Sequence, residues 1–420
     1  MLLPRMIRVR QTFERPLIED VAAETRRQLA SLQLERRVSP GQTVAITAGS
    51  RGIANVADIT RAIVAHCRDL ELQPYIVPAM GSHGGATADG QRELLAGYGI
   101  TQELVGAPIR SSMETVVVDT TPQGIPVHFD RHASQADHVI VAGRVKPHTG
   151  FVGDIESGLH KMMLIGLGKA TGAAIYHKAI KDFTFLEIIR AVAEAVIRRC
   201  RVLCGVAIVE NAYDETARIS AVRPEEFYDR EVELLRLARQ WLPRLPFPDV
   251  DLLIVDRIGK EISGTGMDTN VVGRKYNDHA ATERDEARVR RIFVRGLTEQ
   301  THGNATGIGM AEFTTQSTVD AIDMEITKVN CVTAGHPTAA MLPVTYDTDR
   351  QAIEAALLTI GLTPPERARV VQISDTLHLA TTLVSEAYAG LLQERDDLEA
   401  LDEAAPMSFD ERGGLWPVGE

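Results

Sequence analysis

The sequence lacks the features that would place the protein in a membrane or outside the cell. No apolar run approaches the ~20 residues that a membrane-spanning helix needs. The first sixteen residues interrupt their apolar side chains with Pro4 and four arginines, so they lack the apolar core of a secretory signal. Four cysteines in 420 residues are too few for a disulfide framework. These absences predict a cytoplasmic protein that is not embedded in a bilayer.

The sequence also has fewer positively than negatively charged residues. The chain has 45 Lys and Arg against 57 Asp and Glu, a formal net charge of -12. A surplus of negative charge repels a phosphate backbone, and no basic stripe with interleaved aromatic residues is present. Nucleic acid is therefore excluded as an expected partner. The composition, 44% hydrophobic and 24% charged, is ordinary for a soluble globular protein.

Strand, loop and helix alternate through the first half of the chain. Three segments have the apolar pattern of buried strands, and each is followed by a loop: residues 43–47, 75–80 and 137–142. The three loops carry Arg51, His83 and His148. Carboxyl ends of parallel strands meet at one edge of a sheet, where ligands of α/β proteins bind. We therefore predict a mostly parallel sheet with these three side chains at one edge.

Several helices are predicted to cover that sheet. Helical spacing of apolar residues extends over 16–34, 55–67 and 183–199. Thr87 is a suitable N-cap for a helix that runs to Leu95, and Asp182 for the helix 183–199.

A proline-rich segment divides the chain into two predicted domains. Three prolines within residues 243–248 cannot continue a helix or enter a central strand. We assign residues 1–245 to a first domain and residues 250–420 to a second α/β domain, with strands at 251–256, 291–295 and 368–373 and a helix at 350–360. Ligand sites often lie between domains, so we expect the site in the interdomain cleft.

Residues 143–179 concentrate the side chains that can carry chemistry. Three histidines, His148, His160 and His177, share this stretch with Lys161 and several glycines that permit close approach of a ligand. Imidazole transfers protons near neutral pH and also binds nickel, copper or zinc. A lone histidine is usually structural, but these lie in or beside glycine-rich loops.

Four motifs in order resemble those of the nickel-pincer lactate racemase family. They are Gly81-Ser82-His83 with Thr87, Pro147-His148, Ser157-Gly158-x-x-Lys161, and His177 sixteen residues after the lysine. The family has a G-T-H motif, a P-H motif, an S-G-G-A-K motif and a distal histidine at that spacing. The resemblance covers about residues 40–200 well and the carboxyl-terminal half only loosely.

The resemblance implies a racemase or epimerase of a 2-hydroxy acid. Its cofactor would be a nickel-pincer nucleotide (pyridinium-3-thioamide-5-thiocarboxylic acid mononucleotide), supplied by maturation proteins. By analogy Lys161 is the covalent tether and His177 the protein ligand of nickel. His83 and His148 are the two general acid/bases, one for each face of the substrate, and Arg51 binds its carboxylate.

The sequence also departs from the family pattern. Ala48 stands where the family has an acidic residue, Leu159-His160 replaces two glycines, and three extra residues separate His148 from Lys161. In the second domain Gly273 occupies the place of a glutamine, and Lys275 is the nearest match to a substrate-binding lysine.

These departures predict a substrate larger or more polar than lactate. Ala48 and Gly273 are smaller than the residues they replace, and polar side chains are available for extra contacts: His160, Asp268, Asn270 and Lys275. The alternative is that these side chains face solvent and the pocket is merely loose.

Two other functions fit the same residues. One is a zinc-dependent hydrolase that uses His148, His160 and His177 with Asp154 or Glu156. The other is a non-catalytic small-molecule binding protein that kept the loops and lost the cofactor.

Overall fold

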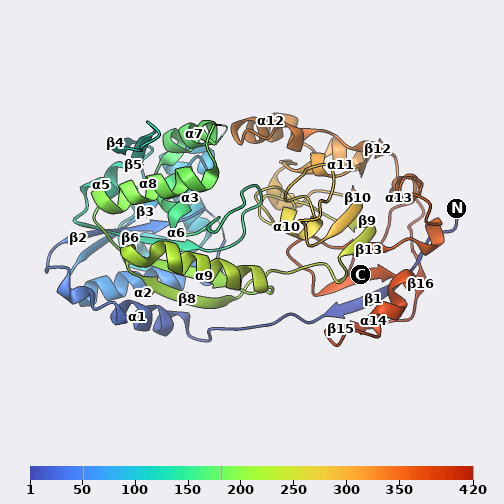
Figure 1. Cartoon of the computed structure of the whole chain (residues 1–420), viewed down its shortest axis with the longest axis horizontal. Helices are drawn as coiled ribbons and strands as arrows, with labels where there is room; N and C mark the ends of the chain where they lie inside the picture. The colour runs from blue at the N-terminus through green and yellow to red at the C-terminus, as the bar shows by residue number, and fades with distance from the viewer. Residues whose placement is uncertain (51, 181, 420) are drawn as a thin grey trace. The chain divides into compact units, whose positions relative to one another are not determined.

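The two larger sheets of the protein belong to separate units of the chain (Figure 1). This computed structural model describes residues 1–50, 52–180 and 182–419. The amino-terminal unit is Arg15–Leu242, and the carboxyl-terminal unit combines Met1–Glu14 with Pro243–Glu420. The change of unit falls at the start of the proline-rich segment. The expected first domain, 1–245, differs because it included the first fourteen residues.

The amino-terminal unit is built on a five-stranded sheet of order β3-β2-β6-β7-β8. Strands β3, β2, β6 and β7 are parallel, and only β8 is antiparallel to its neighbour, which confirms the predicted mostly parallel α/β sheet. The strands are β2 (Thr43–Ala48), β3 (Gln73–Pro78), β6 (His138–Arg144), β7 (Val202–Glu210) and β8 (Thr216–Val222).

Helices cover both faces of this sheet, which is why its strands are apolar on both sides. On one face Val44, Ile46 and Ile76 pack with α1 (Val21–Ser31) and α2 (Val56–Asp69). On the other face Ala45 and Val77 pack with a core that includes α8 (Phe185–Arg199) and α9 (Phe227–Gln240). Around these lie α3 (Ala88–Gly97), α4 (Gln102–Val105), α5 (Arg131–Gln135), α7 (Lys169–Ala179) and the hairpin β4 (Thr115–Thr120) and β5 (Pro126–Asp130).

One of the two predicted helix caps is confirmed and the other is wrong. The Thr87 side chain accepts a hydrogen bond from the Gly90 amide at the start of α3. Helix α8 begins at Phe185, and its N-cap is Thr184, which forms a reciprocal capping box with Glu187. Asp182 lies two residues before this N-cap and is therefore too early to cap the helix. The capping box satisfies two backbone donors at the start of the helix instead.

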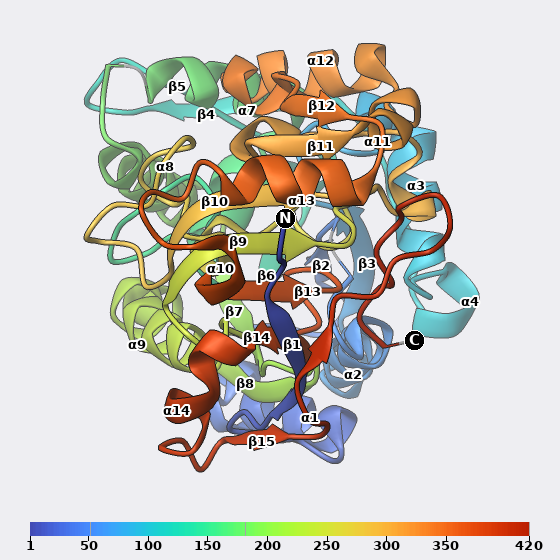
Figure 2. The same cartoon turned by 90° about the vertical axis from the view of Figure 1, so that its right-hand side faces the viewer.

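The carboxyl-terminal unit contains a nine-stranded sheet (Figure 2). Strands β12, β11, β10, β9 and β13 are parallel in that order, and β14, β1 and β15 continue it in antiparallel orientation, with β16 beside β1. Their bounds are β9 (Asp249–Val255), β10 (Arg288–Val294), β11 (Phe313–Thr315), β12 (Val344–Tyr346), β13 (Val370–Ile373), β14 (Thr381–Ser385), β15 (Leu398–Ala400) and β16 (Ala405–Pro406). Helices α10 (Thr269–Val272), α11 (Gln316–Asp320), α12 (Met324–Thr333), α13 (Asp349–Leu357) and α14 (Ala389–Leu392) complete the unit.

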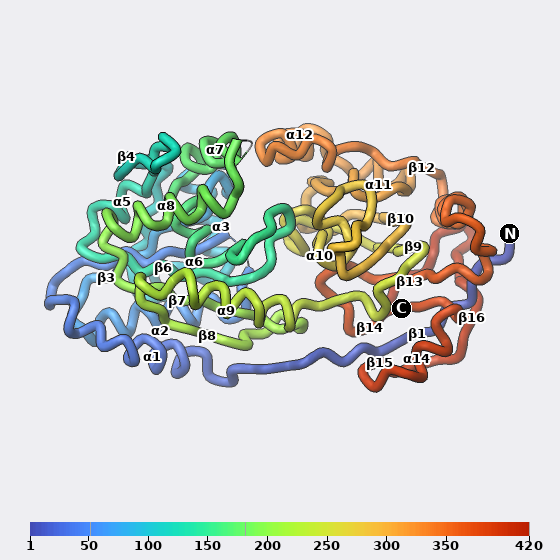
Figure 3. Tube along the Cα trace, viewed as in Figure 1, coloured from blue at the N-terminus to red at the C-terminus, as the bar shows by residue number. Residues whose placement is uncertain are grey.

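Strand β1 (Arg5–Gln11) explains why the first residues belong to this second unit. It pairs with β14, Ile7 opposite Val384, and with β15, Gln11 opposite Leu398. The blue strand therefore lies among red ones in Figures 2 and 3. Pairing of residues so far apart in the chain is set by tertiary packing, which local sequence patterns do not report.

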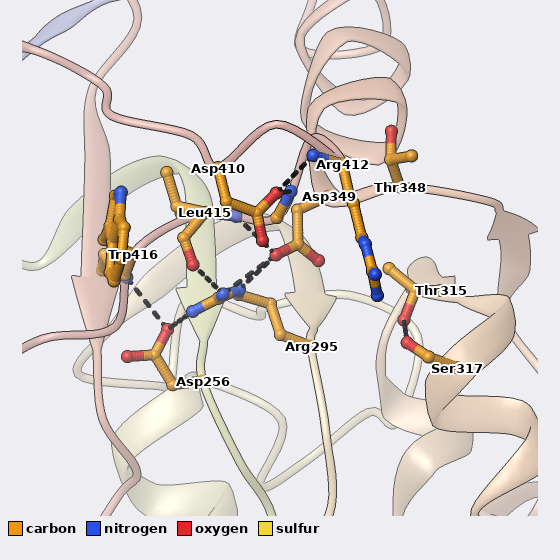
Figure 4. A network of polar contacts seen from close by, with 12 residues as sticks. Asp256, Arg295, Thr315, Ser317, Thr348, Asp349, Asp410, Arg412, Leu415 and Trp416 are labelled. Carbon is orange, nitrogen blue, oxygen red and sulfur yellow. Dashed lines mark hydrogen bonds and ion pairs between the residues drawn. The ribbon is translucent and has the colours of Figure 1, made fainter.

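A buried polar network closes one edge of the second sheet (Figure 4). Arg295, directly after β10, contacts Asp256 Oδ1 at 2.5 Å and Asp349 Oδ2 at 2.9 Å. The same carboxylates accept the backbone amides of Val418 and Leu415, each at 2.8 Å. Residues 415–418 are thus held at the carboxyl ends of β9 and β10. Over the described ranges, no helix is both long and apolar enough to cross a membrane.

Candidate functional site

Loops after three neighbouring parallel strands meet at one edge of the amino-terminal sheet. Strand β2 lies between β3 and β6, so the loops that carry Arg51, His83 and His148 share the same carboxyl edge. The Ser50 hydroxyl contacts His83 Nδ1, which joins the first two loops directly. Arg51 itself lies outside the described residues. The sequence therefore predicted the edge correctly for both histidines.

Close backbone packing fixes the segment that carries Lys161 against this edge. Lys161 ends the short helix α6 (Leu159–Lys161), and a π-helical turn, Met162–Gly166, follows. A Cβ atom added at Gly143 would lie 2.7 Å from Met162 Cγ, and one at Gly166 would lie 2.7 Å from the Ala79 carbonyl oxygen. The contact at Gly166 is with backbone, so a side chain is excluded there, whereas the contact at Gly143 is with the Met162 side chain. Single π turns of this kind occur frequently at functional sites.

The second half of the same segment carries His177. Helix α7 begins at Lys169, directly after Gly168, and His177 lies in its last turn. Both Lys161 and His177 are half-buried. The fifteen residues between them therefore comprise the π turn and most of α7, which gives the spacing a defined geometry.

Buried polar side chains hold the His83 loop through hydrogen bonds to its backbone carbonyl oxygens. Gln91, in α3, donates from Nε2 to the carbonyl oxygens of Gly81 at 3.0 Å and His83 at 3.2 Å. The Lys169 ammonium donates to the carbonyl of Pro78, the last residue of β3, and lies 3.0 Å from Asp130 Oδ2. Burial lowers the pKa of Lys169, and the carboxylate of Asp130 opposes that shift.

The His148 loop is held by a carboxylate instead. Glu156, only 2% exposed, accepts the His148 amide at 2.6 Å and contacts Arg239 of α9 at 2.8 Å. The His148 ring stacks on Phe151 with centroids 4.3 Å apart. Its Nδ1 accepts the amides of Gly150 at 2.9 Å and Phe151 at 3.1 Å. In the neutral ring these donors favour the tautomer with its proton on Nε2.

Comparison with known proteins finds a family match in the first of the two units. Residues 16–184 match the family model described as the lactate racemase N-terminal domain. The matched range covers the amino-terminal unit apart from its first residue and residues 185–242. This match confirms the family resemblance drawn from the motifs, and the matched range contains all five predicted site residues of the unit: Arg51, His83, His148, Lys161 and His177.

Two solved structures share the fold over most of the chain. The lactate racemase apoprotein from Thermoanaerobacterium thermosaccharolyticum is 14% identical, with a TM-score of 0.52, over 88% of this chain and 94% of that one. A protein from Thermotoga maritima is 11% identical, with a TM-score of 0.53, over 88% of this chain and 99% of that one. A search of curated protein sequences gives no match.

Within the matched range, His160 has a structural environment. Its Nδ1 lies 2.9 Å from Glu231 Oε2, which also accepts the His160 amide at 3.1 Å, and both side chains are buried. Glu156 likewise holds its own loop. Among the residues that the structure describes, no group of three or more His, Cys, Asp or Glu side chains is arranged to hold a metal ion. These contacts give the zinc-hydrolase alternative no support.

The carboxyl-terminal unit corrects part of the substrate prediction. Gly273 ends α10 with φ +68°, and a Cβ there would lie 1.9 Å from the Ala287 carbonyl oxygen, so this glycine opens no pocket. Asp268 caps the same helix and accepts both the backbone and side-chain N–H of Asn270. Gly273, Asp268 and Asn270 therefore have structural roles, and they no longer support the prediction of a substrate larger than lactate. The half-buried Lys275, whose amide donates to Asp285 at 3.0 Å, keeps its predicted substrate role only as a prediction.

Sequence reasoning missed the side chains that hold the two histidine loops. Gln91, Lys169, Asp130 and Arg239 were not singled out, and Glu156 was considered only as a metal ligand. One usable signal was present: Lys169 lies between two glycines in an apolar stretch, where a solvated lysine is out of place. The others are identified only by their contacts across the fold.

Proposed function

We propose that this protein racemises or epimerises a 2-hydroxy acid at C2, using a nickel-pincer nucleotide. The observation that carries the proposal is the family match over residues 16–184, within which every predicted acid/base, tether and ligand residue falls. The loops of His83 and His148 follow the parallel strands on either side of β2, at the carboxyl edge where α/β proteins bind ligands.

The residues present fit such a group by their chemistry. A covalent tether needs an amine, which Lys161 offers, and a single nitrogen ligand for nickel is available in His177. The glycine at 166 lets the tether segment pack closely on the Ala79 carbonyl, directly after the end of β3. Because the pincer group supplies its own carbon and sulfur donors, it does not need three protein ligands. When bound, it would accept a hydride from C2 of the substrate and return it.

The protein's own part is binding and proton transfer. One histidine takes the hydroxyl proton as the C2–H bond breaks, which leaves a planar keto acid. Inversion would require C2 to regain hydride on its other face and the substrate oxygen to regain its proton. Groups on both sides are needed within hydrogen-bond reach, and His83 and His148 are assigned to them. Arg51 is assigned to the substrate carboxylate, which a guanidinium can bind through two hydrogen bonds.

Two measurements test this function. Protein made in cells that synthesise the nucleotide should show an increase in intact mass that maps to Lys161. It should then exchange or transfer deuterium at C2 when supplied with 2-hydroxy acids, in a panel of lactate, dicarboxylic hydroxy acids and sugar acids. Cofactor-loaded protein that inverts none of them would refute the reaction. A loaded mass at a residue other than Lys161 would refute the assignment of the tether.

A further inference from the structure

Lys169 is a fully buried ammonium group at the junction of three segments of the site. Its side chain is 0% exposed, as is that of its partner Asp130, and their charged atoms are 3.0 Å apart. It is the first residue of α7, which leads to His177, and it follows the π turn that begins after Lys161. Its Nζ donates to the Pro78 carbonyl, at the end of the strand that leads to His83.

Gln91 extends this contact into the His83 loop. Its Oε1 lies 3.3 Å from Lys169 Nζ, and its Nε2 donates to the carbonyl oxygens of Gly81 and His83. The amide is fully buried, so both ends of the group are used inside the protein. The chain of contacts thus runs from Asp130 through Lys169 and Gln91 to the backbone of His83.

Stability alone does not account for this arrangement. A buried ion pair generally gives no advantage over apolar side chains of the same size, because both charges lose their hydration. Lys169 also has φ +55°, a left-handed conformation that glycine adopts at lower cost. What the ammonium provides, and an apolar side chain does not, is a set of directed hydrogen-bond donors toward Pro78 and Gln91.

We propose that Lys169, with Asp130 and Gln91, is a positioning group that fixes the His83 loop against the segment carrying Lys161 and His177. This inference rests on the proposed function, in which those three residues act on one substrate. Lys169 touches neither substrate nor cofactor in this role. Its effect reaches His83 through the carbonyl oxygens that Gln91 holds.

Gln91→Leu tests the last link while leaving the ion pair of Lys169 and Asp130 in place, although Lys169 loses Gln91 Oε1 as an acceptor. It removes the donors to Gly81 and His83 at nearly constant volume. In full-length, cofactor-loaded protein, we expect faster amide hydrogen exchange in residues 79–91 and unchanged nickel content. We expect kcat to fall by about tenfold to a hundredfold, since small misplacements of a reacting group have effects of that size, with KM little changed. Gln91→Glu keeps an acceptor for Lys169 but loses the donors, so it should behave like Gln91→Leu.

Gln42→Leu is the matched control. Gln42 holds another loop of the same sheet, accepting the Ser39 amide at 2.7 Å and contacting His138 Nε2 at 2.9 Å near the amino end of β2. This variant should leave exchange in residues 79–91 and kcat unchanged.

The double variant Lys169→Met with Asp130→Asn tests the ion pair. Both charges are removed together, and the asparagine side-chain oxygen can still accept the Ala133 amide that Asp130 caps. We expect faster exchange in residues 79–91 with nickel retained. Unchanged exchange in both this variant and Gln91→Leu would overturn the positioning role. Exchange that rises as expected in protein whose wild type inverts no substrate would instead refute only the proposed reaction.

Discussion

The two histidine loops of the amino-terminal unit occupy equivalent places in the sheet but are built differently. Both follow parallel strands at the same edge. The His83 loop is held through its carbonyl oxygens by the donors of Gln91, whereas the His148 loop is held through its backbone amide by the acceptor Glu156. The first support is fully internal, and the second connects to the partly exposed Arg239.

The hydrogen-bond partners of the two imidazole rings also differ. His83 Nδ1 contacts the Ser50 hydroxyl, which can accept or donate a hydrogen bond, so the contact allows the tautomer in which Nε2 is a base. His148 Nδ1 accepts two backbone amides, so its neutral ring presents an N–H at Nε2. The neutral His83 ring can therefore take a proton at Nε2, whereas the neutral His148 ring donates a hydrogen bond there. Equivalent positions in a sheet therefore do not give equivalent chemistry.

The largest effect is expected at Lys161, the proposed tether of the cofactor. Lys161→Arg should abolish cofactor retention and all turnover, because a guanidinium cannot form the covalent bond of the tether. Intact mass and nickel analysis measure this directly. Full loading of the Lys161→Arg protein would show that only the positive charge matters.

The next effect separates the two histidines. His83→Gln should lower kcat by about a hundredfold to ten-thousandfold, the usual range for loss of a general base. His148→Gln should lose less, about tenfold, because the glutamine amide can still donate a hydrogen bond. Both variants should keep nickel, and His132→Gln, in α5, is the control.

Equal losses in the two glutamine variants would contradict the difference in role. Loss of nickel from the His148 variant, with nickel retained in a His177→Ala variant, would contradict the assignment of His177 as the ligand.

A smaller effect is expected on stability when the support of the His148 loop is removed. Glu156→Ala leaves the His148 amide and the Arg239 guanidinium without their acceptor. The free energy of unfolding should fall by about 1–3 kcal/mol, the range for a lost buried hydrogen bond, with little from the half-exposed arginine. Urea unfolding measures this loss, with Glu194→Ala on the exposed face of α8 as control. A change within error would mean that the loop is held by its aromatic stacking alone.

The smallest effect is expected on the pH dependence of stability, from histidines away from the carboxyl edge of the amino-terminal sheet. Burial lowers the pKa of His66 and His138 below the ordinary value of about 6.5. The unfolded chain then binds protons more readily than the folded one, so stability is present above pH 6.5 and is lost as the pH falls through that value. His66→Gln should flatten the decline in unfolding free energy between pH 7.5 and 5.5 by less than about 1 kcal/mol. A steeper decline in that variant would contradict the sign.

The sequence by itself determined the local elements and the chemistry they carry. Residues 43–47 and 75–80 coincide with β2 and β3 to within two residues, Thr87 caps its helix, and the motifs from His83 to His177 fall within the range that matches the lactate racemase N-terminal domain model. Apolar period, caps and motif spacing are properties of adjacent residues, so they can be read before folding. Tertiary structure alone decided which sheet β1 joins and that Gly273 ends a helix. It also decided the partners of Lys169, which are Pro78, 91 residues away in the chain, and Gln91, 78 residues away. Such partners are selected by packing and by the need to satisfy buried polar groups, and neither leaves a periodic pattern in the chain.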